Sequence, residues 1–389
     1  MSNRMSDLDR SGAAEVRRAI GRPSRVGIGA RLALLAFSVF VLEATWRCAA
    51  LVYIGSNDPE HNTTAPTGTL SGSGWELQGN WGNFVGTPIA PNLFVSARHV
   101  GGNVGDTFVL QGKRYQATAK FLDAASDLAV YKIAGHFPGH AQLYRGTNEL
   151  NKLLVVCGRG ALRGTQVNVT NTDDSVTLRG WRWGTGDGRV RWGTNRVHSI
   201  VNLGAGLGNT LMFTFDATGG DDETALAGGD SAGAVFVRSN LEWFLAGINY
   251  AVSGPYSYTN SGTGMNASLF DARGFFIGGE GNWKAIDSGT SPVPGECYAT
   301  RIADRLAWLD ALIASDGNTW TGPVLESADD PTGPFKTVSS GVLVDLEGRE
   351  IRIPPPSSRS HYRLRDAVAW RIGQPTLSNG FLVLPFDLP

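Results

Sequence analysis

Hydrophobic residues between positions 68 and 290 occur in short runs, some alternating with polar residues and some apolar throughout, and no helical period appears. Runs of four to seven such residues are typical of β-strands. Turn-forming residues separate the runs, for example at Gly101-Gly102 and Gly219-Gly220. This spacing predicts an all-β barrel or sandwich. The expected strands are 84–90, 93–97, 107–110, 128–133, 153–157, 210–215, 234–238 and 243–249.

A helical period follows these runs. Apolar residues recur there at intervals of three or four, which predicts a helix over about 298–314. Its apolar face consists of Tyr298, Ile302, Leu306, Leu309 and Ile313. Beyond the helix, prolines interrupt short strand-like pieces, so we expect a small β-sandwich-like domain over residues 318–389.

The first 50 residues have the pattern of a leader segment. Eight arginines surround an eleven-residue, mostly apolar run from Leu32 to Leu42, which is too short to span a membrane comfortably. A basic flank and a run of this length favour a secretory signal, cleaved among the small residues 44–50. A buried helix and a retained membrane anchor are the alternatives. Export to the periplasm, the cell surface or the medium is the expected localisation.

Composition and charge exclude several classes of protein. The 51 glycines and 18 prolines show no Gly-X-Y period, which excludes collagen. Residues 1–50 hold eight of the 34 basic and four of the 35 acidic residues, which leaves 26 basic and 31 acidic residues. A mildly acidic remainder argues against nucleic-acid partners. Of the three cysteines, Cys157 and Cys297 would stay after cleavage, and the sequence leaves open whether they bond.

Three residues in different segments have the chemistry of nucleophilic catalysis. Ser231 lies between glycines in Gly228-Gly229-Asp230-Ser231-Ala232-Gly233, and a serine hydroxyl needs a base to become a nucleophile. His99 follows an apolar strand and can be that base. Asp127 begins another apolar strand and can orient the histidine. Backbone N–H groups of the glycine-rich turn can hold an oxyanion.

These segments resemble the trypsin-like serine peptidases of the chymotrypsin fold. Ser96-Ala97-Arg98-His99 is similar to the family's T-A-A-H turn, Asp127-Leu128-Ala129-Val130 to its D-I-A-L strand, and Gly229-Asp230-Ser231-Ala232-Gly233 to G-D-S-G-G. The order His, Asp, Ser is the family's order. The gap of 28 residues from His99 to Asp127 is short, as in exported bacterial members. The resemblance covers roughly residues 60–315.

The resemblance implies two antiparallel six-stranded β-barrels, over about 68–140 and 150–296, closed by the C-terminal helix within a domain of residues 51–317. It implies oxyanion donors at the backbone N–H groups of Gly229 and Ser231. It also implies a pocket for the substrate side chain before the cleaved bond, formed by Ala225, Val252 and Gly295. These positions provide no carboxylate for a basic side chain, so a small or medium apolar residue is expected there.

The expected function is a secreted serine endopeptidase that acts on protein or peptide substrates without a cofactor or metal, and without a membrane span once the signal is removed. Ala232 stands where the family has glycine, so its methyl group is expected to crowd the site. A catalytically impaired peptide-binding protein or surface adhesin on the same fold is the alternative. Asp230 is present, but no clear activation sequence precedes the first barrel, which favours a permanently formed site.

The tryptophan- and arginine-rich pieces 181–184 and 191–193 are expected to form one hairpin with stacked aromatic and guanidinium faces. The less favoured interpretation is a platform for a ligand. The acidic residues Asp216, Asp221, Asp222 and Glu223 have no EF-hand spacing and are expected to form a solvated loop rather than a calcium site.

Overall fold

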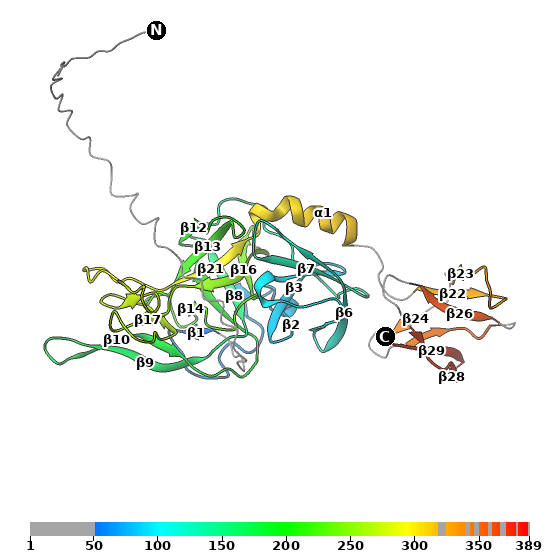
Figure 1. The fold of residues 1–389 in the computed structure, drawn as a ribbon, viewed down its shortest axis with the longest axis horizontal. Coiled ribbons are helices and arrows are strands. Elements are labelled where there is room, and N and C mark those ends of the chain that lie inside the picture. Colours follow the sequence, from blue (N-terminus) through cyan, green and yellow to red (C-terminus); the bar gives the residue numbers. More distant parts are fainter. Residues whose placement is uncertain are drawn as a thin grey trace, which may run out of the picture. The chain divides into compact units, whose positions relative to one another are not determined.

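A computed structural model describes residues 51–317, 324–338, 343–345, 350–356, 360–365, 371–378 and 380–387. The predicted leader, residues 1–50, lies outside these described ranges. Strands dominate the described part, and its one α-helix, α1 (Leu306–Asp316), follows the strands of the 51–317 region (Figure 1). Short 3-10 turns in this region are Gly68–Leu70, Trp75–Leu77, Arg98–Val100 and Ala303–Arg305.

The first strands close into a six-stranded antiparallel barrel, in the order β2-β3-β4-β7-β6-β5. An aromatic core fills it, in which the Phe94 ring stacks on Phe108 at 4.2 Å between centroids and on Tyr131 at 5.1 Å. Stacked aromatics bury much apolar area, which stabilises a barrel of this size. The strands are β2 (Gly79–Trp81), β3 (Phe84–Ala90), β4 (Leu93–Ala97), β5 (Thr107–Leu110), β6 (Lys113–Leu122) and β7 (Leu128–Ile133).

The second half is built on a seven-stranded antiparallel sheet, in the order β11-β8-β15-β16-β21-β13-β12, one strand more than expected. The amide of Asn195 on β11 donates to the carbonyls of Thr214 and Thr224, at 2.8 and 2.9 Å, and so ties β11 to the end of β13. The sheet therefore curls toward a barrel. Its strands are β8 (Leu153–Gly158), β11 (Arg191–Arg196), β12 (Ser199–Asn202), β13 (Asn209–Thr214), β15 (Ala234–Ser239), β16 (Glu242–Val252) and β21 (Glu296–Arg301).

A closed first barrel, a curled second sheet and a helix after the last strand are the all-β, chymotrypsin-like architecture that the sequence predicts. The predicted start of the helix at Tyr298 is wrong. Residues 296–301 form β21, which pairs with β13 and β16, and Tyr298 is buried in that sheet. The apolar spacing from 298 to 313 therefore spans a strand and a helix, and the second sheet extends past residue 296.

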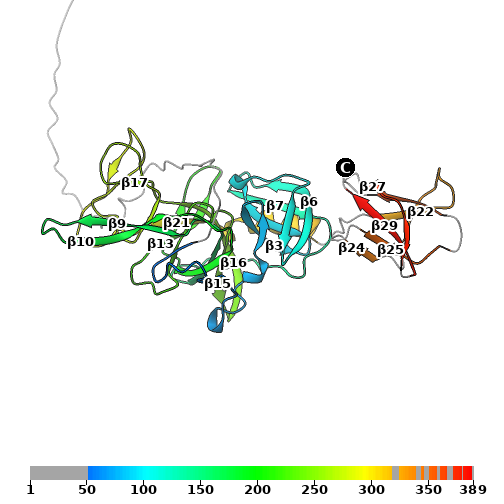
Figure 2. The same cartoon turned by 90° about the horizontal axis from the view of Figure 1, so that it is seen from below.

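The second half also carries additional strands. β9 (Arg163–Thr170) and β10 (Val176–Trp183) form a hairpin (Figures 1 and 2). The short strand β18 (Ala267–Leu269) pairs with β10. The pieces 181–184 and 191–193 therefore do not form one hairpin, because β10 pairs with β9 while β11 pairs with β8. Three short strands within residues 253–294 form another small sheet: β17 (Tyr256–Ser257), β19 (Phe276–Ile277) and β20 (Lys284–Ala285).

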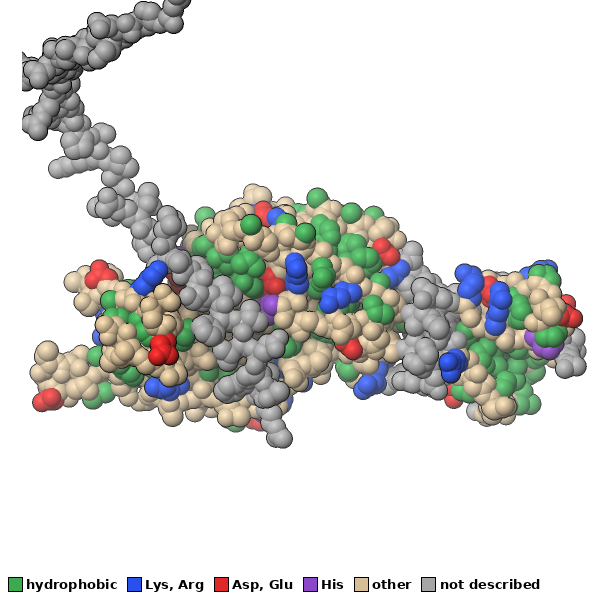
Figure 3. Space-filling view, in the orientation of Figure 1, with side chains coloured by type: hydrophobic (Ala, Val, Ile, Leu, Met, Phe, Trp, Pro, Cys, Tyr) green, Lys and Arg blue, Asp and Glu red, His purple; other side chains and the backbone are tan. Residues whose placement is uncertain are grey.

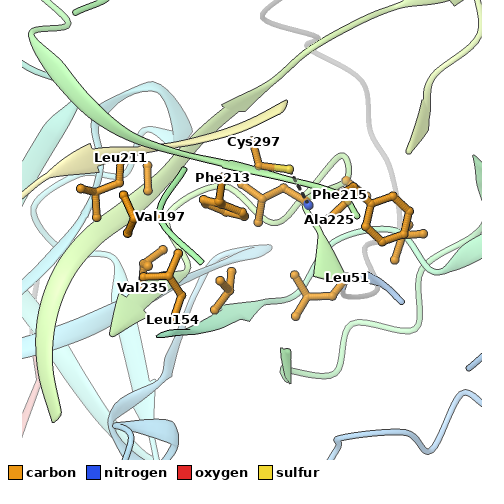
Figure 4. Close-up of a cluster of buried hydrophobic side chains, with 14 of the residues drawn as sticks. Leu51, Leu154, Val197, Leu211, Phe213, Phe215, Ala225, Val235 and Cys297 are labelled. Carbon is orange, nitrogen blue, oxygen red and sulfur yellow. Dashed lines mark hydrogen bonds between the residues drawn. The ribbon is translucent and has the colours of Figure 1, made fainter. Parts of the chain in front are cut away.

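The core of the second half extends to the start of the described chain. Leu51 is fully buried there with Phe213, Phe215 and Ala225 (Figure 4), and β1 (Val52–Tyr53) pairs with β14 (Thr224–Ala225). A different apolar cluster joins residues of both halves, including Val95 of β4, Phe236 of β15 and Leu309 of α1. The two halves thus share buried surface, on which the site is built.

The described strands after residue 323 form two antiparallel sheets with a small apolar core of their own, which contains Leu325, Ile351 and Phe386. Lys and Arg side chains and hydrophobic side chains both lie on the surface of this part (Figure 3). The domain boundaries at 50/51 and 317/318 stay predictions. The strands are β22 (Val324–Ala328), β23 (Lys336–Thr337), β24 (Leu343–Asp345), β25 (Glu350–Ile353), β26 (His361–Arg365), β27 (Arg371–Ile372), β28 (Thr376–Ser378) and β29 (Phe381–Asp387).

Candidate active site

The register of two neighbouring strands brings His99 and Asp127 together. Ala97, the last residue of β4, pairs with Leu128, the first residue of β7. His99 follows in the 3-10 turn after β4, and Asp127 directly precedes β7. The His99 backbone N–H donates to Asp127 Oδ1 at 3.0 Å, and His99 Nδ1 lies 2.5 Å from Oδ2. Two contacts to a buried carboxylate fix both the position and the orientation of the imidazole.

Ser231 comes to the same place from the second half of the molecule. It lies in the loop between β14 and β15, and its Oγ is 2.8 Å from His99 Nε2. The carboxylate, imidazole and hydroxyl thus form a continuous chain of contacts from Asp127 to Ser231. The imidazole is about one-fifth exposed, so a substrate can approach the hydroxyl.

Asp123, the other carboxylate in this segment, has a different set of partners. It accepts hydrogen bonds from the Ser126 hydroxyl at 2.6 Å and the Ala125 backbone N–H at 3.1 Å. The side chain is buried and stabilises the turn that precedes Asp127. Its role in the described structure is thus to shape this turn.

Hydrogen bonds to carbonyl groups set the orientation of the peptide units around Ser231. The Gly228 carbonyl accepts from the Ala161 N–H at 2.9 Å, and the Asp230 carbonyl accepts from the Gly233 N–H and the Asn249 amide, both at 3.1 Å. In a trans peptide the N–H points opposite to the carbonyl. The N–H groups of Gly229 and Ser231 therefore point away from these anchoring contacts. Within the described residues, neither N–H donates to a protein acceptor.

Asp230 is a fully buried carboxylate held by backbone N–H groups. Gly160 and Ala227 each donate to it at 2.7 Å, and Leu51 donates to both of its oxygens at 3.3 Å. Burial raises the pKa of Asp230 to about 7, which these hydrogen bonds counteract only in part. The contact between Leu51 and Asp230 was not predicted from the sequence. It links the loop of Ser231 to the first described residue.

Ala232 has the left-handed backbone conformation, with φ of 68°, which favours glycine. Its side chain is fully buried in the apolar cluster between the two halves, and its N–H donates to the Asn249 carbonyl at 2.9 Å. The methyl group therefore packs in the core. The expectation that it crowds the site is wrong.

The three predicted pocket residues lie around Cys297. Val252 pairs with Cys297, the Leu226 N–H next to Ala225 donates to the Cys297 sulfur at 3.2 Å (Figure 4), and Gly295 precedes it by two residues. A side chain at Gly295 would meet the Leu269 carbonyl and the Tyr256 hydroxyl at 3.1 Å. Cys157 and Cys297 are both buried and free, so they form no disulfide. The role of these residues as a pocket stays a prediction.

The segment 253–294 could have brought a carboxylate to this pocket. Asp271 is instead bound by two arginines: Arg273 contacts both of its oxygens and Arg179 contacts Oδ2. Glu280 is exposed to solvent. Two guanidinium groups on one carboxylate leave it no capacity for a substrate cation.

The predicted acidic loop is only partly solvated. Asp222 lies 2.9 Å from His61 Nε2 and accepts from the Asn62 amide at 2.8 Å, while Glu223 is buried. Burial raises the pKa of Glu223 to about 8. Within the described residues, no group of three or more His, Cys, Asp or Glu side chains could hold a metal ion.

Tyr250 is a site residue that the sequence did not reveal. Its ring lies edge-on to the His99 imidazole, with 5.7 Å between centroids, and it is half-buried on β16. The predicted strand ended at residue 249, and no role was expected for Tyr250.

The comparisons with known proteins found similar folds only among solved structures. No family model and no curated protein matches the chain. Neuropsin, a serine protease of mouse brain, is 12% identical, with a TM-score of 0.35 and coverage of 62% of this chain and 96% of its own. A mutant of human heparin-binding protein is also 12% identical, with a TM-score of 0.39 and coverage of 64% of this chain and 96% of its own.

The described part of this chain contains no helix that is long and apolar enough to cross a membrane. The fold class of the chain rests on its own closed barrel, curled sheet and terminal helix.

Proposed function

We propose that this protein is an exported serine endopeptidase that hydrolyses peptide bonds through an acyl-enzyme. The observation that carries this proposal is the chain of contacts Asp127–His99–Ser231, with 2.5 and 2.8 Å between the interacting atoms. A hydroxyl and a base at this distance, with the base oriented by a carboxylate, have the geometry of an activated nucleophile.

In the proposed reaction, Ser231 Oγ attacks the carbonyl carbon of the substrate while His99 Nε2 accepts the hydroxyl proton. The imidazolium then donates this proton to the leaving amine, and the peptide C–N bond breaks. Water attacks the resulting ester by the same route in reverse, which releases the acid and restores Ser231. Asp127 keeps the imidazole in position and stabilises its positive charge.

The oxyanion of the tetrahedral intermediate needs donors that are in place before it forms. We assign this role to the N–H groups of Gly229 and Ser231. Their orientation by the anchored carbonyls of Gly228 and Asp230, and their lack of a protein acceptor in the described structure, support the assignment.

We further propose a small or medium apolar residue before the cleaved bond. The environment of Ala225, Val252 and Gly295 supports this preference, because Asp271 is bound by arginines and Glu280 is exposed. A substrate Lys or Arg there would lack a partner, and an unpaired buried charge is strongly unfavourable.

Digestion of a peptide library tests both statements. The intact protein should cleave after small or medium apolar residues, and Ser231→Ala should reduce total cleavage by about 10⁴-fold or more. Unchanged cleavage by Ser231→Ala would contradict the mechanism. Cleavage mainly after Lys or Arg would contradict only the proposed preference for an apolar residue before the cleaved bond. The buried position of the Ala232 methyl group argues against the catalytically impaired alternative.

A further inference from the structure

The indole of Trp183 covers part of the loop that carries Ser231. Trp183 is the last residue of β10, and Gly228 is exposed at the start of the Gly228–Ser231 turn. A Cβ atom built on Gly228 would lie 3.3 and 3.4 Å from two atoms of the indole ring. Apart from the two chain neighbours of Gly228, no other described residue has a side chain within 4 Å of this position, so the ring packs directly beside the loop backbone at Gly228.

Hydrogen bonds hold this ring in one orientation. The indole N–H donates to the Ser268 hydroxyl on β18 at 3.1 Å, and this hydroxyl reaches the Leu226 carbonyl at 3.5 Å. The Trp183 backbone N–H donates to the Asn266 carbonyl at 3.0 Å. Both the ring and its anchor therefore contact the loop 225–228. This loop supplies the predicted wall of the pocket and is followed directly by the proposed oxyanion donor Gly229.

The environment of Trp183 differs from that of Trp181, two residues earlier on the same face of the strand. Trp181 is buried under the Arg163 guanidinium, which lies 3.8 Å from its ring centroid. Trp183 packs on the same core but stays half-exposed, with its polar atom bonded. An aromatic ring whose N–H is satisfied presents its remaining exposed surface as apolar area, which suits contact with another apolar side chain.

From this geometry we propose that Trp183 is a specificity-determining residue, whose ring forms an apolar wall at the entrance of the pocket for the substrate residue before the cleaved bond. It favours a medium-sized apolar side chain, such as Leu or Met, over Ala. The inference rests on the proposed peptidase function and deepens it. The ring and its anchor lie on the additional strands β10 and β18. These strands belong neither to the first barrel nor to the seven-stranded sheet.

Steady-state kinetics on two peptides that differ only in Leu or Ala before the cleaved bond test this inference. In the full chain, Trp183→Ala should lower the Leu-to-Ala ratio of kcat/KM at least tenfold, mainly through a higher KM for the Leu peptide. Trp183→Phe should retain most of the ratio. Ser268→Ala removes the anchor but not the ring, so it should produce a smaller loss. Trp308→Ala, at a half-buried tryptophan on α1, is the matched control and should leave the ratio unchanged.

Labelling of Ser231 by a fluorophosphonate separates failure of the inference from failure of the proposed function. If the intact chain labels and cleaves, an unchanged Leu-to-Ala ratio in a folded Trp183→Ala overturns the inference. If Trp183→Ala does not fold, an unchanged ratio in a folded Ser268→Ala overturns it, because loss of the anchor is expected to lower the ratio. If the intact chain neither labels nor cleaves, the proposed function itself is contradicted.

Discussion

The two halves of the 51–317 region position their parts of the candidate site by different means. In the first barrel, the register of two neighbouring strands places His99 beside Asp127. Ala97 pairs with Leu128, His99 lies two residues after Ala97, and Asp127 directly precedes Leu128. In the second half, Ser231 lies on a loop held by residues far away in the sequence, such as Leu51 and Gly160 on Asp230. The first barrel thus positions His99 and Asp127 through two neighbouring strands, whereas the second half positions Ser231 through contacts between distant segments and also carries the additional strands.

Asp127→Asn tests the first barrel and should have a large effect on catalysis. The substitution keeps the size of the side chain but removes the charge that orients His99 and stabilises the imidazolium, so kcat should fall about 10⁴-fold. Thermal unfolding should change little by comparison, and this is the control for structure. A loss of less than tenfold in kcat would show that another group orients the histidine.

Phe94→Ala and Phe275→Ala test whether a cavity in one cluster of buried side chains affects the rest of the protein. Phe94 is fully buried at the centre of the aromatic core of the first barrel, so its truncation should cost about 3–5 kcal/mol of unfolding free energy. Phe275 belongs to a separate cluster of the 253–294 segment. Its truncation should raise hydrogen exchange in this segment while the labelling of Ser231 is retained. Loss of labelling would show that the added segment supports the site directly.

Two buried carboxyl groups of the second half predict an unusual dependence of stability on pH. The pKa of Asp230 is raised to about 7 and that of Glu223 to about 8, above the values of the unfolded chain. Between the unfolded and the folded pKa of each group, the folded state therefore binds more protons than the unfolded state. The free energy of unfolding should therefore fall as the pH rises from about 4 to about 8. Glu223→Gln should flatten the upper part of this curve, measured by denaturant unfolding. A curve that rises with pH would contradict the assignment.

The contact of Leu51 with Asp230 adds a prediction about the predicted leader boundary. In a protein that begins at Leu51, the α-ammonium group would lie where the N–H now contacts both Asp230 oxygens. An adjacent positive charge lowers the pKa of a carboxyl group, so the fall in stability between pH 4 and 7 should be smaller than in the full chain. Identical pH profiles for the two proteins would show that this nitrogen carries no charge at the Asp230 site.

Ala232→Gly should have the smallest effect. Glycine relieves the left-handed backbone at φ of 68°, but it also loses a buried methyl group and makes the unfolded chain more flexible. These terms oppose each other, so the unfolding free energy should change by less than about 1 kcal/mol. Hydrolysis should be unchanged, because the methyl group packs in the core. An increase in kcat of more than tenfold in Ala232→Gly would show that the methyl group crowds the site.

The sequence predicted most of the first barrel and the residues that meet at the site. The strands 84–90, 93–97, 107–110 and 128–133 have the predicted bounds, because each is short, apolar and enclosed by turn residues. The local sequence pattern did not predict the secondary structure where tertiary contacts determine it. Tyr298 fits a helical period but lies in a central strand, and the additional strands β9 and β10 contain many polar residues that are not buried.

Contacts between distant segments were beyond prediction for a different reason. Nothing in the residues around Leu51 or Trp183 indicates the loops that they contact, since each contact depends on how whole sheets pack. The motif segments, by contrast, contain the local chemistry of their own turns. The sequence therefore revealed the side chains that meet at the candidate site but not the groups that hold their loops.

Stoichiometric labelling by a fluorophosphonate, read by mass spectrometry of the intact full chain and its peptides, tests the central claim most directly. We expect one label per chain, on Ser231, and labelling slowed by at least 10³-fold in His99→Ala, because the hydroxyl then lacks its base. The probe needs no knowledge of the substrate. An unlabelled Ser231 in the folded protein, or equal labelling in His99→Ala, would contradict the claim that His99 activates Ser231.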